Sequence, residues 1–145
     1  MADKSEFKEN SQAVQAHLNI TQNVIQRMVS NSASCKGWAI ALVSAVLVIV
    51  ADKGKSDYFL IAVIPAVLFW ALDAYYLGLE KMFCSSYNHF IGKLHAGKLV
   101  ADDLYAVSPT GNMIKSFFCG VLSFSVWPLY VTLLVMMYLA KQFLT

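Results

Sequence analysis

The sequence predicts an all-α membrane protein with three transmembrane helices and long cytoplasmic helical extensions of the first two. Of its 145 residues, 58% are hydrophobic and only 14% are charged, against about 25% charged residues in a typical soluble domain. Residues 58–79 are apolar for long enough to cross a bilayer core of about 30 Å as a helix. A chain this short cannot bury so many apolar side chains in one water-soluble core. We therefore expect residues 1–145 to form a single membrane domain.

The charged and metal-ligating residues exclude several classes of function. The net charge of +2 and the single arginine, Arg27, predict no nucleic-acid interface. Cys84, His89 and His95 are metal-ligand types in one predicted helix, but their positions lie about 140° and about 120° apart around the helix axis, which is poor geometry for one metal site. No catalytic pairing or phosphate-binding loop follows from residue spacing. We expect no bound metal, no cofactor and no enzymatic activity.

The first predicted helix covers residues 11–51. A stripe of apolar and small residues recurs at steps of three and four, as in one face of a helix, and no proline interrupts it. Its first half, 11–35, is an amphipathic cytoplasmic helix, and residues 36–51 form span 1. The stripe either covers the cytoplasmic ends of the other helices or mediates self-association. The stripe comprises Val14, Leu18, Thr21, Ile25, Met28, Ser32, Cys35, Ala39, Leu42 and Val46.

The second predicted helix begins after a short polar turn at residues 52–57, so spans 1 and 2 form an antiparallel hairpin. Span 2 covers residues 58–79 and includes Pro65, which we expect to kink it. A helical period of apolar residues continues beyond the span to His95, and Ala96-Gly97 then ends the helix. Residues 80–112 are thus a cytoplasmic extension and connector, with a short helix near residues 101–106.

The third predicted span covers residues 113–140. Pro128 lies near its middle, and Gly120 is a small residue expected to face a neighbouring helix. Lysine and arginine are more frequent in cytoplasmic loops than in outer ones. Eight of the eleven basic residues lie in the first segment, up to the start of span 1, or between spans 2 and 3. We therefore expect the N-terminus inside and the C-terminus outside. The eight are Lys4, Lys8, Arg27, Lys36, Lys81, Lys93, Lys98 and Lys115.

Asp73 is the residue that most needs an explanation, because a carboxylate inside an apolar span is costly unless it is paired or hydrated. Lys36 lies at the matching depth on the antiparallel span, so we expect it to contact Asp73, or Ser34 or Asn31 to donate hydrogen bonds. Three roles stay open for Asp73. It fixes the helix register, it lines a hydrated path in an oligomer together with Lys36 and Glu80, or it carries protons.

Residues on the cytoplasmic extensions are the candidates for contacts with other chains. Leu18, Ile25 and Met28 belong to the stripe of the first helix, and Tyr87 and His89 lie on the extension of the second. We expect these side chains to contact a second copy of the chain or a cytosolic partner protein.

Two segments resemble a group of small bacterial membrane proteins. Residues 22–28 match a QxVIxRM-like core, and the second span ends in a W-x-L-D-x-Y/F-Y/F-L-x-x-E signature. The resemblance covers residues 17–90, and the third span has no counterpart in it. It departs from the group at Lys81, where an arginine soon after the glutamate is common. The signature residues here are Trp70, Leu72, Asp73, Tyr75, Tyr76, Leu77 and Glu80.

This resemblance implies a function in antiphage defence. Proteins of that kind are similar to membrane effectors that assemble and compromise the bacterial inner membrane upon infection. Our leading hypothesis is an oligomeric inner-membrane effector that permeabilises or depolarises the membrane when triggered. Its expected partners are the lipid bilayer, further copies of itself and a cytosolic defence protein. The alternatives are a non-conducting membrane anchor that recruits a cytosolic partner and a small transporter.

Overall fold

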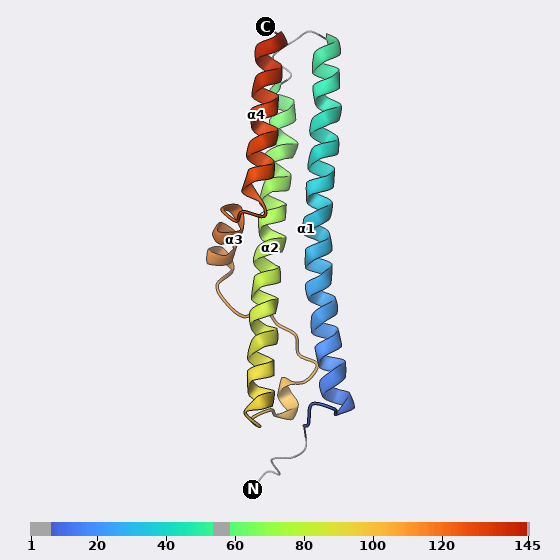
Figure 1. Ribbon diagram of the computed structural model, residues 1–145, viewed down its shortest axis with the longest axis vertical. Coiled ribbons are helices and arrows are strands. Elements are labelled where there is room, and N and C mark those ends of the chain that lie inside the picture. The colour runs from blue at the N-terminus through green and yellow to red at the C-terminus, as the bar shows by residue number, and fades with distance from the viewer. Residues whose placement is uncertain (1–6, 54–58, 145) are drawn as a thin grey trace.

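Two long antiparallel helices dominate the computed structural model, which describes residues 7–53 and 59–144. Helix α1 covers Gln12–Lys53 and helix α2 covers Phe59–His95, and the two lie side by side over most of their length (Figure 1). At 1.5 Å per residue, the 42 residues of α1 measure about 63 Å, roughly twice the thickness of a hydrocarbon core. Both are long and apolar enough to cross a membrane.

The bounds predicted for the first two helices are confirmed to within two residues. Helix α2 continues through Pro65 and ends at His95, where the sequence indicates, two residues before Gly97. Gly97 has a φ of +63°, which a residue without a side chain adopts at little cost. The N–H of Lys98 then donates to the carbonyl of Lys93 (3.0 Å) and that of Gly97 to Leu94 (3.0 Å), which is a Schellman cap. The turn predicted at 52–57 falls mainly outside the described residues.

The apolar stripe of α1 packs inside the chain. Most of its residues are buried or half-buried, including Val14, Thr21 and Ala39. One assignment is wrong, because Leu42 is 40% exposed and Val43 is buried in its place. A straight helix has 3.6 residues per turn, so positions chosen at a 3.5-residue repeat drift around the helix axis. By residue 42 this drift has moved the predicted stripe off the buried face.

The region predicted as one third span, 113–140, is not a single helix. Helix α3 covers Met113–Val121 and helix α4 covers Trp127–Leu144. Pro128 explains the break, because it lacks an N–H and its ring excludes a helical carbonyl one turn earlier; it is tolerated in the first turn of a new helix. The carbonyl of Ser123 accepts from the N–H groups of Val126 (2.8 Å) and Trp127 (3.0 Å) and closes the turn between the helices.

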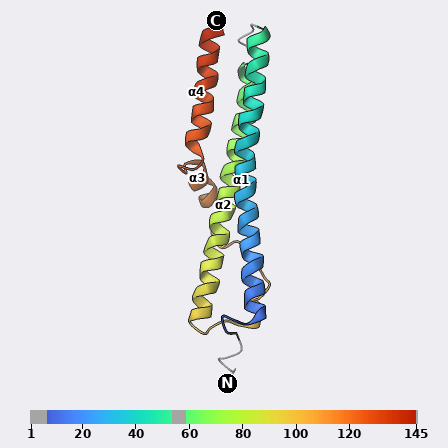
Figure 2. The ribbon, with the colours of Figure 1, turned by 45° about the vertical axis from the view of Figure 1, so that its right-hand side comes forward.

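Helices α3 and α4 both lie against α2. Figure 2 shows α4 standing apart from α1 towards the C-terminal end. The helix α3 packs so closely on α2 that a Cβ at Gly120 would overlap the carbonyl oxygen of Ala74, and a Cβ at Gly78 would lie 3.2 Å from the carbonyl of Ser116. Gly120 therefore faces a neighbouring helix, as predicted.

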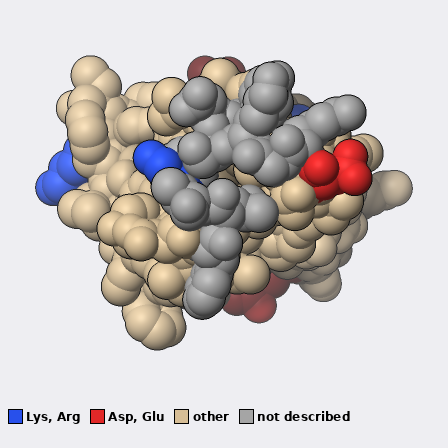
Figure 3. Space-filling model, turned by 90° about the horizontal axis from the view of Figure 1, so that it is seen from above, with Lys and Arg blue, Asp and Glu red and all other residues tan. Residues whose placement is uncertain are grey.

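The described side chains form two apolar clusters. The larger lies among α1, α2 and α4 and comprises Ala39, Val43, Ala62, Ala66, Leu77, Val126, Tyr130, Leu133 and Met137. The smaller lies at the opposite end, where Val14, Phe90 and Leu94 are covered partly by the connector between α2 and α3. That connector contains a 3-10 helix, η2, at Ala101–Asp103, shorter than the helix predicted for 101–106. In the view from the end nearest the C-terminus, both basic and acidic side chains of the described residues are visible (Figure 3).

Candidate functional site: a buried ion pair between α1 and α2

The polar cluster around Asp73 is the best candidate for a functional site in the described residues. Asp73 lies on α2, and none of its side chain is exposed. The Lys36 ammonium on α1 lies 2.8 Å from Oδ1 and 2.8 Å from Oδ2 of the carboxylate. The predicted contact between these two residues is confirmed. It arises because an antiparallel hairpin brings residues of equal depth together.

A serine hydroxyl completes the cluster. The Ser32 hydroxyl donates to Oδ1 of Asp73, and the Lys36 ammonium donates to the Ser32 oxygen over 3.0 Å. The expected hydroxyl donor, Ser34, instead donates to the carbonyl of Ser30 on its own helix (2.9 Å). The sequence held the signal: Ser32 and Lys36 are four residues apart and share a helix face, whereas Ser34 is rotated by about 200° from each.

The charge of the Asp73 carboxylate is balanced by Lys36, but only one of its two oxygens accepts hydrogen bonds from the described residues. Oδ2 of Asp73 is buried and accepts no hydrogen bond from the described residues, although the Lys36 ammonium lies within ion-pair distance of it. The contact of Lys36 with Oδ2 is therefore ionic, whereas its contact with Oδ1 is also a hydrogen bond. Lys36 keeps 23% of its side chain exposed, so its ammonium stands between the buried carboxylate and the surroundings of the helix pair.

Helix α4 closes the cluster from the other side. The Tyr130 ring is fully buried and stacks on Trp70 of α2, with ring centroids 5.9 Å apart. Its hydroxyl donates to the carbonyl of Phe69 (3.1 Å) and lies close enough to Asp73 to interact with it electrostatically. The indole N–H of Trp70 donates to the carbonyl of Val121 (3.4 Å), a terminal carbonyl of α3. One chain therefore covers Asp73 without help from a second copy.

The other predicted site residues lie away from this cluster. Glu80 is half-buried about two turns further along α2, and the described contacts of Asp73 do not include it. Of the residues proposed for contacts with other chains, Met28 is buried, Leu18 and Tyr87 are half-buried, and His89 is exposed. A partner would reach Met28 only after α1 had moved away from its neighbours.

No family model, curated protein or solved structure matches the chain.

Proposed function

We propose that this protein is an oligomeric effector of bacterial antiphage defence that compromises the inner membrane when triggered. Two long apolar helices support membrane insertion. Each exceeds the thickness of a bilayer, so about half of the helix pair stands outside it. The orientation we propose keeps the N-terminus, η2 and residues 98–112 in the cytoplasm, with α3 and α4 returning the chain through the membrane as a broken third span.

The observation that carries this proposal is the ion pair of Lys36 with Asp73, whose carboxylate is fully buried. Replacing a buried ion pair with apolar residues of similar volume often leaves a protein equally stable or makes it more stable. Stability alone therefore does not explain why Lys36 and Asp73 stand at these positions. In the compact protomer the carboxylate is covered by α1 and lies beside α4. Separating α1 from α2 would place two charges in contact with lipid, which draws water into the membrane.

This arrangement is a resting state in the proposed mechanism. Several copies assemble, and the cytoplasmic halves of α1 and α2 hold the pair closed until infection changes them. Once the helices separate, Asp73 and Lys36 line a hydrated path, and Glu80 lies nearer its cytoplasmic mouth. The trigger and the defence role rest on the resemblance of residues 17–90 to membrane effectors of this kind.

The test is membrane depolarisation in bacteria that express the full chain from an inducible promoter. A potential-sensitive dye should report depolarisation with the native sequence, and phage plaques should decrease at an expression level that cells tolerate. Asp73→Leu should abolish both effects while crosslinked oligomers persist. Asp52→Leu, the same substitution at an exposed acid near the end of α1, is the matched control. Depolarisation that is unchanged in Asp73→Leu would refute the mechanism.

A non-conducting membrane anchor is the second candidate, and a different observation favours it. The connector packs on the ends of α1 and α2 and leaves a cavity of about 230 Å³ that is lined mostly by polar side chains, among them His89, Lys93 and Asp103. Such an ordered cytoplasmic end is suited to holding a partner protein. An anchor predicts no depolarisation at any expression level, together with a stable complex that is lost when residues 98–112 are replaced by a flexible linker.

A further inference from the structure

His17 joins three segments that are far apart in the sequence. It lies on α1 and is only 5% exposed. Its ring stacks on Phe90 of α2, with centroids 4.1 Å apart and planes 22° apart. Its Nδ1 atom accepts the backbone N–H of Tyr105, which follows η2 in the connector, over 3.0 Å. One imidazole thus contacts α1, α2 and the connector at the same point.

The connector is held against this imidazole in a strained conformation. Tyr105 has a φ of +63°, in the left-handed region that residues with side chains rarely occupy. Asp103 fixes the preceding turn, since one carboxylate oxygen pairs with the Lys93 ammonium (2.6 Å) and the other accepts the N–H of Val100 (3.2 Å). Strain of this kind persists only while surrounding contacts impose it.

The accepted hydrogen bond requires the neutral form of His17. A protonated imidazole carries a hydrogen on both nitrogens, so Nδ1 could no longer accept from Tyr105 and two N–H groups would face each other. Burial lowers the pKa of His17 below its usual value, and the Asp103 carboxylate opposes this by favouring the charged form. The charged and titratable groups facing the same cavity are His89 and Lys93 on α2 and Asp102 and Asp103 on the connector.

We propose that His17 is a pH-sensitive latch, and that its protonation releases the connector, residues 98–112, from the ends of α1 and α2. Release removes the Tyr105 hydrogen bond, relaxes the left-handed backbone and uncovers Phe90. The latch works whether or not the protein permeabilises a membrane.

The pH dependence has a definite sign. His17 binds a proton more readily in the released state, where it is hydrated, than in the closed state. The closed state is therefore fully favoured above about pH 6.5, the usual value for histidine, and loses stability as the pH falls towards the lowered pKa. Over that interval the opening equilibrium rises about tenfold for each pH unit.

Hydrogen exchange at the amide of Tyr105 tests the latch directly. The full chain in lipid nanodiscs is followed by mass spectrometry between about pH 7.5 and about pH 5.5, with rates converted to protection factors. The protection of the segment that contains Tyr105 should fall about tenfold per pH unit below about pH 6.5. His17→Phe keeps a ring against Phe90 but has no acceptor, so this amide should be unprotected at every pH.

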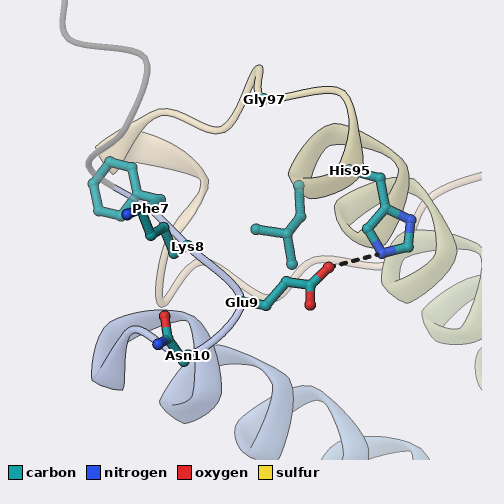
Figure 4. A pocket seen from close by; sticks show the side chains of 7 residues that line it. Phe7, Lys8, Glu9, Asn10, His95 and Gly97 are labelled. Carbon is teal, nitrogen blue, oxygen red and sulfur yellow. Dashed lines mark ion pairs between the residues drawn. The ribbon is translucent and has the colours of Figure 1, made fainter.

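Matched variants separate His17 from the other histidines. In His17→Asn the amide oxygen takes the place of Nδ1 and does not titrate, so protection should be independent of pH. His89→Gln and His95→Gln should leave the native profile unchanged. His95 is the stricter control, because its Nε2 lies 3.5 Å from Glu9 at the same end (Figure 4).

Two results would overturn the latch. One is a protection factor in the native chain that does not change with pH, and the other is a pH dependence that survives in His17→Asn. Amides near residue 70 in the middle of α2 report global folding in the same experiment. A variant that loses their protection is unfolded, and the decision then rests on the native profile and the two histidine controls.

Discussion

Replacing Lys36 with methionine should destabilise the protein more than any change at an exposed position. The substitution keeps a long apolar stem but removes the ammonium that lies 2.8 Å from both carboxylate oxygens of Asp73. The carboxylate is fully buried, so it would retain only the hydroxyl of Ser32 as a polar partner in this pair of helices. Removing one partner of a buried ion pair costs about 3–5 kcal/mol, because the other charge is left uncompensated.

The double variant Lys36→Met/Asp73→Leu separates the pair's net contribution from the cost of an orphaned charge. With both charges gone, the site becomes apolar within an already apolar helix pair, and stability should lie within about 1 kcal/mol of the native chain or above it. Asp73→Leu alone should cost about 1–3 kcal/mol, because the Lys36 side chain that loses its partner is still 23% exposed and can reach polar surroundings. The cycle should then give a coupling energy of at least about 3 kcal/mol between the two positions.

Equilibrium unfolding in mixed micelles gives the four free energies. Tryptophan fluorescence is a suitable signal, because Trp70 lies one turn from Asp73 and contacts both α3 and α4. The reasoning fails if Lys36→Met costs less than about 1 kcal/mol, which would show that water or lipid headgroups already solvate the carboxylate. It fails equally if the double variant is as unstable as the sum of the two single variants.

Three further predictions concern packing, backbone strain and acid stability. Gly120→Ala should cost about 1–3 kcal/mol in the same unfolding assay, because its Cβ would overlap the Ala74 carbonyl, whereas Gly92→Ala should be neutral or stabilising, since a Cβ there meets nothing within 4 Å. Tyr105→Gly should raise stability by up to about 1 kcal/mol by removing the left-handed strain, measured as an increase in the thermal midpoint. A hydrogen bond from the Lys93 ammonium is the main reason that the pKa of Asp103 lies below its usual value, and burial opposes this effect. The ionised Asp103 therefore stabilises the folded connector above about pH 4, and this stabilisation is lost as the pH falls through the lowered pKa. Asp103→Asn should remove that loss from a pH titration of hydrogen exchange in the connector.

The sequence predicted the features that depend on local information. The bounds of α1 and α2 follow from apolar periodicity and from Gly97, whose backbone conformation few other residues adopt. The pairing of Lys36 with Asp73 follows from equal depth in an antiparallel hairpin, because the cost of an isolated charge narrows the choice of partner. Both inferences depend only on positions along one helix or between two helices that are adjacent in the sequence.

Features that depend on tertiary packing were missed. Composition cannot distinguish one helix over residues 113–140 from the two helices α3 and α4. Pro128 was a sequence signal for a break, because proline interrupts the hydrogen bonding of a helix. The contact between His17 and Tyr105 joins residues 88 positions apart through a backbone N–H, which is present at almost every residue and carries no sequence signal. The sequence alone predicts only that His17 is either solvated or placed between helices, and the stack on Phe90 shows that it lies between them.

The two interfaces of α2 differ in what holds them, and this difference indicates which one opens. Apolar contacts between helices gain little from the hydrophobic effect in lipid, so close packing and polar contacts determine association there. The contact with α3 depends on backbones that approach at Gly120, and such packing is lost only when whole helices separate. The contact with α1 combines apolar packing with the ion pair of Lys36 and Asp73, and water or a competing charge can weaken an ion pair without moving a backbone. In the mechanism that we propose, the trigger would therefore separate α1 from α2 while α2, α3 and α4 stay together.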